Sequence, residues 1–256
     1  MSGKKIRFPK ERTLVLDILR AAKSVPAFPL ERTLCLAPIE PLRQRAAQRI
    51  SWTAIFLRAW ALVSQQVPQL RQCYLSRPWS HLYQHPHAVA SVSVHRREAG
   101  AGAGRLIFCR VKAPELLTLS QIQDAIDLTQ RGPLAQAFAD CNRLDGCPWP
   151  WRRLLWYLMM RWWGDAKSSQ LGTFSISSLA GQNVLNRQHP LIVTTSLSFS
   201  KLDDSGNCIV TLLCDHRVLD GYLGAECLNH LETFLLGAVC DELKTLGRRA
   251  QRVKVA

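Results

Sequence analysis

One stretch of this sequence decides the fold: Asp215-His216-Arg217-Val218-Leu219-Asp220-Gly221. It contains the pattern His-x-x-x-Asp-Gly and follows directly on an apolar, strand-like run at residues 208–214. Histidine is the side chain whose ordinary pKa lets it take and return a proton near neutral pH. An Asp four residues after the histidine, followed by Gly, fits a turn that leads into the next element. The stretch therefore predicts a strand, a turn that carries a candidate general base at His216, and a further element.

A second stretch, Gly172–Gly181 with the sequence GTFSISSLAG, lies upstream, and its Ser177 comes 39 residues before His216. The two stretches together resemble the signature motifs of the catalytic domain of dihydrolipoamide acyltransferases from 2-oxo acid dehydrogenase complexes. That domain shares its fold with chloramphenicol acetyltransferase. Residues 22–28 and 50–70 also resemble this family in order and spacing, so the resemblance covers most of residues 10–243.

The resemblance implies an α+β fold, a chloramphenicol acetyltransferase-like two-layer sandwich with a mixed β-sheet and packed helices. It implies that His216 is the general base of an acyltransferase (EC 2.3.1.-) and that the Ser177 hydroxyl hydrogen-bonds the tetrahedral oxyanion. Asp220 would orient the site, in some members by pairing with an arginine, and Arg12 lies near the position of that arginine. The supporting residues expected from the two motifs are Thr173, Asp215 and Gly221.

The reaction expected from the resemblance moves an acyl group from a thioester of coenzyme A or a carrier protein to a thiol, hydroxyl or amine acceptor. No covalent enzyme intermediate, no tightly bound cofactor and no metal is implied. The family further implies a homotrimer with the active site at the subunit interface, and in the dehydrogenase complexes such trimers assemble into cages. We expect a free-standing enzyme, because the chain carries no lipoyl domain and no Pro/Ala-rich linker. We expect it in the cytoplasm, because residues 1–10 are charged and lack an apolar signal core.

Two alternatives remain open at the level of sequence. Beside the free-standing acyltransferase, the alternatives are the acyltransferase core of a dehydrogenase complex that receives a lipoyl domain in trans, and a non-catalytic trimeric scaffold. Retention of both the His216 and Ser177 motifs speaks against the scaffold, because a scaffold needs neither side chain. Acyl chain length and acceptor do not follow from the sequence.

The net charge and the distribution of basic residues indicate which kinds of partner the protein can bind. The formal net charge is +14, and residues 1–12 and 244–256 supply nine of these charges. Such ends suit an acidic partner, namely coenzyme A phosphates, an acidic carrier protein or a membrane surface, or they act only as solvated tails. The basic residues do not alternate with aromatic ones and no nucleic-acid motif is present, so a nucleic-acid partner is not expected. The nine cysteines are scattered without a Cys-x-x-Cys pair, which favours reduced thiols over disulfides or zinc.

We expect a basic arm at residues 1–10, a catalytic domain at 11–243 and a basic tail at 244–256. Helices are predicted at 11–23, 51–67, 119–130 and 221–236, with a short helix start or turn within 38–47. Strands are predicted at 28–37, 89–95, 105–111, 174–176, 191–200 and 208–214, with a glycine-rich hairpin loop at 98–104.

Residues 148–163 match none of the features expected from the family resemblance. They hold five of the eight tryptophans, and six apolar residues follow helical spacing on one face, Trp151, Leu154, Leu155, Leu158, Met159 and Trp162. Three interpretations are open: a core or subunit-packing helix, a lining for a long acyl chain, or an interfacial membrane contact through Trp and Arg.

Overall fold

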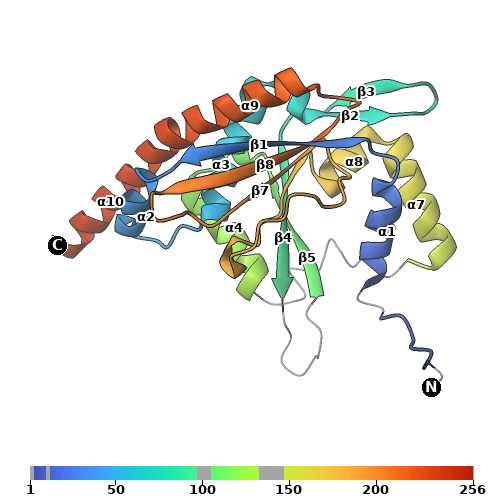
Figure 1. The fold of residues 1–256 in the computed structure, drawn as a ribbon, viewed down its shortest axis with the longest axis horizontal. Helices are drawn as coiled ribbons and strands as arrows, with labels where there is room; N and C mark the ends of the chain where they lie inside the picture. The colour runs from blue at the N-terminus through green and yellow to red at the C-terminus, as the bar shows by residue number, and fades with distance from the viewer. Residues whose placement is uncertain (1–2, 10–11, 97–104, 133–146, 256) are drawn as a thin grey trace.

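The computed structural model describes residues 3–9, 12–96, 105–132 and 147–255. Its centre is a six-stranded sheet in the order β1-β8-β7-β6-β4-β5 (Figure 1). Neighbouring strands are antiparallel except for β4–β6 and β6–β7, which are parallel. A separate two-stranded sheet pairs β2 with β3. The strands are β1 Ala27–Cys35, β2 Gln72–Leu75, β3 His81–Gln84, β4 Val89–Arg96, β5 Arg105–Lys112, β6 Phe174–Ile176, β7 Thr195–Phe199 and β8 Asn207–Asp215.

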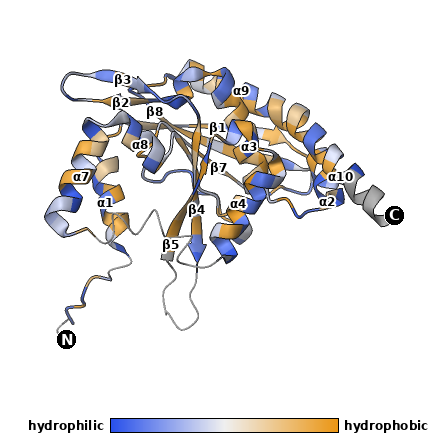
Figure 2. Cartoon of the chain, turned by 180° about the vertical axis from the view of Figure 1, so that it is seen from behind, coloured by the Kyte–Doolittle hydropathy of each residue, from blue (hydrophilic) through white to orange (hydrophobic). Residues whose placement is uncertain are grey.

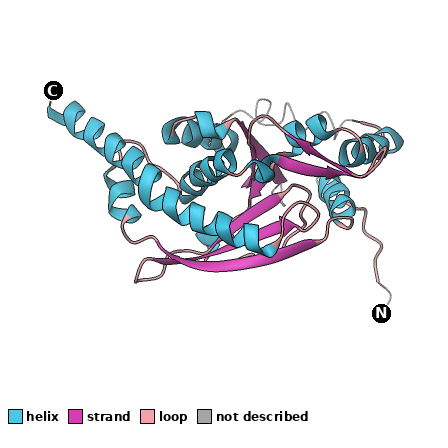
Figure 3. Ribbon diagram, turned by 90° about the horizontal axis from the view of Figure 1, so that it is seen from above, coloured by secondary structure: helices cyan, strands magenta, loops and turns pink. Residues whose placement is uncertain are grey.

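Helices cover the sheet. The chain ends in a long helical run that lies along one side of the sheet and projects beyond it (Figure 3). The α-helices are α1 Thr13–Ala22, α2 Ile39–Arg45, α3 Trp52–Gln66, α4 Leu119–Arg131, α7 Trp149–Arg161, α8 Gly164–Leu171, α9 Gly221–Phe234 and α10 Cys240–Val255. Shorter turns of helix are η2 Pro68–Arg71, η3 Pro114–Leu116 and η4 Ala180–Gln182, and a π-helical stretch, η5 Leu235–Val239, joins α9 to α10.

The main hydrophobic core lies between one face of the sheet and helices α3, α4 and α9. Helix α3 is the most buried of these, with Phe56 and Trp60 fully enclosed. Its limits are local in origin: the Ser51 hydroxyl accepts a hydrogen bond from the Ala54 amide at 3.2 Å, and Pro68 stands just beyond its end. Because one face of the sheet packs into this core, the strand residues on the opposite face are available to form the candidate site.

The opposite face of the sheet is polar at its centre. Serines alternate with apolar residues in three strands, as Ser91-Val92-Ser93, Ser175-Ile176-Ser177 and Ser196-Leu197-Ser198. Because side chains alternate between faces along a strand, the apolar residues enter the core and the serines share the other face. The valine, isoleucine and leucine between them are indeed core residues. Helices α1 and α7 lie side by side near the β5 edge (Figure 1).

The predicted α+β class with a mixed sheet and packed helices is confirmed, and most predicted elements lie within a few residues of the observed ones. The last helix was predicted to end at 236, which is wrong: it continues through η5 and α10 to Val255, so the predicted tail is helical to that point. The short elements β2, β3 and α8 were not predicted. The predicted glycine-rich loop at 98–104 lies outside the described residues.

Several of the cysteines lie inside strands of the main sheet. Cys109, Cys208 and Cys214, expected inside strands, are buried free thiols, and burial raises the pKa of Cys214 to about 12. Among the described residues, no helix combines the length and apolarity that a bilayer crossing demands.

An ion pair holds α1 against α7. Arg152 Nε lies 2.8 Å from Asp17 Oδ2, and the Asp17 side chain is only 4% exposed. We expect Arg152→Ala to lower the free energy of unfolding by about 3 kcal/mol, because it removes the nearer of the two arginines that, within the described residues, pair with the buried Asp17 carboxylate. Urea unfolding measures the loss. The control is Arg153→Ala, whose exposed side chain stacks on Trp149 and whose loss costs about 1 kcal/mol or less. Equal losses in both variants would contradict a structural role for the ion pair.

Candidate active site

His216 lies in the turn directly after β8, at the surface. Its backbone amide donates a hydrogen bond to the Pro26 carbonyl at 2.9 Å, and its ring packs against Phe28 with 4.6 Å between ring centroids. The side chain itself is exposed. The structure therefore holds the backbone and one ring face in place while it leaves the imidazole free to meet a substrate or another subunit.

The turn that carries His216 is fixed by its two neighbours. Asp215 is buried, and its two carboxylate oxygens accept hydrogen bonds from Arg217 Nε at 2.8 Å and Nη2 at 2.6 Å. The Asp215 Oδ1 atom also accepts from the Arg217 amide, and Arg217 Nη1 donates to the Ser24 carbonyl. This two-point contact is the geometry in which Arg and carboxylate bind most strongly. The Asp and Arg that flank His216 are thus structural, and they orient the turn.

Asp220 caps the helix that follows. Its carboxylate accepts a hydrogen bond from the Leu223 amide at 2.8 Å, so it is the N-cap of α9, and Gly221 is the first helical residue. The side chain of Asp220 is exposed. Arg12 lies at the start of α1, and within the described part of the chain it does not pair with Asp220. The arginine beside this motif is instead Arg217.

The second motif is shaped by its glycine and threonine. Gly172 has φ +100°, and a Cβ there would lie 3.0 Å from the Val89 carbonyl oxygen, so only glycine fits this turn without strain. Thr173 is buried, and its hydroxyl accepts a hydrogen bond from the Val89 amide at 3.0 Å. Both residues attach the start of β6 to β4. Ser177 follows β6 directly, and its amide donates to the Leu197 carbonyl at 2.9 Å.

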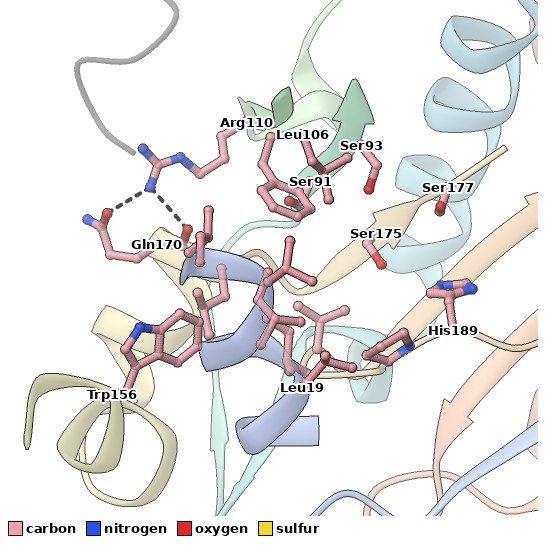
Figure 4. Close-up of a pocket in the computed structure, with 18 of the residues that line it drawn as sticks. Leu19, Ser91, Ser93, Leu106, Arg110, Trp156, Gln170, Ser175, Ser177 and His189 are labelled. Atoms are coloured by element: carbon pink, nitrogen blue, oxygen red, sulfur yellow. Dashed lines mark hydrogen bonds between the residues drawn. The ribbon is translucent and has the colours of Figure 1, made fainter. Parts of the chain in front are cut away.

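Ser177 lines a cavity of about 290 Å³ on the serine-bearing face of the sheet (Figure 4). Serines of β4 and β6 form its floor, and apolar residues of α1 with Trp156 of α7 enclose it. Figure 4 shows Ser175, Ser177 and His189 together at one end, and Arg110, Gln170 and Trp156 at the other. His216 is not among the residues that line it.

Strand register shows that His216 and Ser177 are far apart within one chain. Cys214 pairs with Thr195, and Thr195 pairs with Phe174, so these three residues are level across β8, β7 and β6. His216 lies two residues beyond this level in one direction, and Ser177 lies three residues beyond it in the other. At about 3.3 Å per residue and 4.8 Å per strand, the two residues are roughly 19 Å apart. One chain alone therefore cannot bring the two predicted catalytic residues together.

His189 also belongs to the site, although it lies in neither of the two motifs and the sequence does not predict its role. His189 Nε2 lies 2.7 Å from the Ser196 hydroxyl, which is 2.6 Å from the Ser175 hydroxyl. Burial lowers the pKa of His189, so its ring is neutral at pH 7. The signal that could have found this network is the Ser-apolar-Ser pattern in three strands, which places all these hydroxyls on one face.

Helix α7 faces the core with a different side from the one that its apolar spacing suggested. Arg152, Trp156 and Met159 are buried, whereas Trp151, Leu154, Leu155 and Trp162 are exposed. Apolar and polar residues are mixed along the helix in Figure 2. Trp156 is the α7 residue that reaches the cavity. The exposed Trp and Leu side chains leave subunit packing and membrane contact open as roles for the outer face.

Comparison with solved structures identifies the fold. A probable dihydrolipoamide acetyltransferase from Listeria monocytogenes is 15% identical, with a TM-score of 0.62 over 94% of this chain and 95% of that chain. The dihydrolipoamide acetyltransferase of Azotobacter vinelandii is 16% identical, with a TM-score of 0.64 over 93% and 94%. A truncated catalytic core of the 2-oxoacid dehydrogenase complex from Thermoplasma acidophilum is 14% identical, with a TM-score of 0.65 over 92% and 99%.

This chain therefore has the fold of the dihydrolipoamide acyltransferase catalytic domain, as the two motifs predicted. At such identities the likeness establishes the fold and leaves the activity to be argued from the site. No protein-family model matches the sequence. No curated protein matches it either.

Proposed function

We propose that this protein is an acyltransferase that moves an acyl group from a thioester to a thiol, hydroxyl or amine acceptor. The observation that carries this proposal is the retention of His216 and Ser177 on this fold, at two places that only a second copy of the chain can join. In the proposed homotrimer, His216 of one subunit faces Ser177 of its neighbour, as the family resemblance implies.

The chemistry follows from the two side chains. His216 accepts the proton of the acceptor, whose sulfur, oxygen or nitrogen attacks the thioester carbonyl carbon. The Ser177 hydroxyl donates a hydrogen bond to the tetrahedral oxyanion that forms. When the oxyanion collapses, the carbon–sulfur bond breaks, and the leaving thiolate takes the proton from the His216 imidazolium. Donor and acceptor meet directly, and no bond to the enzyme forms.

A solved relative supports these roles. In the Azotobacter vinelandii dihydrolipoamide acetyltransferase, a serine, a histidine and an asparagine have been investigated for their role in the catalytic mechanism, and the last two are four residues apart. His216 and Asp220 have the same spacing. Asp220 stands where that protein has asparagine, and we propose that it positions the turn and helix α9 through its N-cap hydrogen bond.

A second cavity next to Ser177 supports a phosphate-bearing donor. It measures about 660 Å³, shares Ser93 with the first cavity, and is lined by the basic side chains of Arg96 and Arg131 together with His95. Arginine suits phosphate because its planar group donates several hydrogen bonds. We propose that coenzyme A, or the phosphopantetheine arm of a carrier protein, approaches Ser177 from this side.

The competing functions differ in what they require. A core of a dehydrogenase complex that uses a lipoyl domain in trans would turn over dihydrolipoamide and assemble into a cage, as does the cubic core of the pyruvate dehydrogenase complex, which shares the fold. A scaffold would show neither turnover nor sensitivity to His216. Light scattering separates trimer from cage, and cell fractionation tests the proposed cytoplasmic location.

The first test is thiol release from a panel of acyl-coenzyme A thioesters with simple thiol, amine and hydroxyl acceptors. The same panel offered on acyl-carrier proteins distinguishes the two classes of donor. Dihydrolipoamide as acceptor identifies the dehydrogenase role. Absence of turnover with every donor and acceptor would contradict the proposal.

Replacement of the oxyanion donor gives a second test. We expect Ser177→Ala to lower kcat by about 10²–10³-fold with little change in KM, because the hydrogen bond strengthens only as the oxyanion forms. Steady-state kinetics on the preferred donor measure both constants. Ser205→Ala is the control, since Ser205 lies in an exposed turn. An unchanged kcat in Ser177→Ala would contradict the proposed role of Ser177 as the oxyanion donor.

A further inference from the structure

The cavity beside Ser177 has two chemically different walls. Its floor carries the hydroxyls of Ser91, Ser93, Ser175 and Ser177. Its roof is apolar, formed by Leu14, Val15, Ile18 and Leu19 of α1 together with Trp156 of α7, and Leu106 and Phe108 of β5 extend the floor as an apolar strip. Helix α1 supplies four of these apolar residues and is held in place through the Asp17–Arg152 ion pair. The cavity is therefore defined by the fold, and the Asp17–Arg152 ion pair holds its roof in place.

Strand register fixes the direction of the cavity. Ser91 pairs with Arg110 on β5 and with Ser175 on β6, so these residues form one row across the floor. Arg110 Nη1 donates hydrogen bonds to the carbonyl and the side-chain oxygen of Gln170, at 3.0 and 2.7 Å, at the end of the cavity opposite Ser177 (Figure 4). The cavity thus runs from Ser177, at the proposed reaction centre, to the hydrogen bonds between Arg110 and Gln170 at its other end.

We infer that this cavity binds the unbranched hydrocarbon chain of a substrate, with the reacting group at Ser177 and the chain tip toward Gln170. This inference rests on the proposed acyl transfer and names its substrate class. An apolar cavity of about 150 Å³ holds a benzene molecule, so the 290 Å³ here accommodates roughly ten carbon atoms. An acetyl group would leave most of this apolar lining without contact.

The energetics give a chain-length dependence. Burial of each methylene contributes enough to change binding about fourfold. The hydroxyls at the Ser177 end suit the carbonyl or heteroatom of the reacting group, whereas α1 offers the chain an apolar wall that extends to the Arg110–Gln170 contact. The rate constant kcat/KM should therefore rise with chain length until the cavity is full and then fall.

Either substrate can carry the chain, and two series of substrates distinguish them. In the first, acyl-coenzyme A donors from acetyl to tetradecanoyl are used with a small thiol acceptor. In the second, acetyl-coenzyme A is used with alkanethiol or alkylamine acceptors of increasing length. We expect kcat/KM to rise about fourfold per methylene in one series, with an optimum near eight to ten carbons. A rise in the first series assigns the cavity to the acyl chain, and a rise in the second assigns it to the acceptor.

Two variants move the optimum in opposite directions. Ser91 lies in the middle of the floor and is 6% exposed, so Ser91→Phe fills the cavity and shifts the optimum to shorter chains. Leu19 is 41% exposed, so Leu19→Ala is tolerated and shifts it to longer chains. Ser205→Phe, in an exposed turn, is the matched control and keeps the wild-type profile.

A binding measurement separates this inference from the proposed function. Decanoate is expected to raise the Tm of the wild-type protein and to have a smaller effect on Ser91→Phe, since a ligand stabilises the state that binds it. A rise in Tm with decanoate but no acyl transfer would support the hydrocarbon site and contradict the proposed function. Acyl transfer that is fastest with the shortest acyl donor in the first series and with the shortest acceptor in the second, together with no Tm shift by decanoate, would overturn the inference and leave the proposed function standing.

Discussion

His216→Ala is expected to lower the rate of acyl transfer by about 10²–10⁴-fold, the range that a positioned general base contributes. The imidazole is exposed, and among the described rings it packs against Phe28, so its removal should leave the folded structure unchanged. Thiol release from the preferred acyl-coenzyme A measures the rate. Circular dichroism and the Tm should match those of the wild-type protein.

The control for this variant is His230→Ala. His230 lies on α9, outside both cavities, and its replacement should leave the rate unchanged. A His216→Ala protein that retains wild-type turnover would refute the proposed base and direct attention to His189, the histidine that lines the cavity with Ser177.

Mixing two inactive variants should restore activity. In a trimer that places His216 of one subunit against Ser177 of the next, co-expressed His216→Ala and Ser177→Ala chains form some sites with both side chains intact. If subunits assemble at random, such sites make up about a quarter of the total, so activity returns to about a quarter of the wild-type level. Differently tagged chains allow the mixed assemblies to be isolated and assayed.

The matched control pairs His216→Ala with the double variant that lacks both side chains. No combination of these chains contains an intact site, so that mixture should stay inactive. Mixed assemblies of the two single variants that remain inactive would contradict a site shared between subunits. The register of β6, β7 and β8 makes restoration the expected result, because it separates the two residues within each chain.

The fold could be expected from the sequence because the two motifs carry the family resemblance, and each motif is a short, local pattern. The requirement for glycine at position 172 comes from a positive φ, and the Asp215–Arg217 contact spans two residues, so each leaves a short pattern. The alternation of apolar residues with serines likewise marks strands. These features are readable without knowledge of distant partners.

What could not be predicted depends on pairing between distant segments. The separation of His216 from Ser177 follows from the register of three strands, and register is set by packing across the whole sheet. The sequence left the role of the apolar face of α7 open because Trp and Leu at helical spacing fit a core and an interface equally. His189 lies in a segment without periodicity, and only the fold brings it to Ser196.

The helical run that begins at the N-cap Asp220 and ends at Val255 has a practical consequence for labelling. At about 1.5 Å per residue, its far end lies roughly 50 Å from Gly221. A fluorophore or immobilisation tag attached there reports on the protein without obstructing the His216 turn. Helix α1, by contrast, forms the roof of the cavity and follows closely on the N-terminal segment, so the C-terminal end is the better point of attachment.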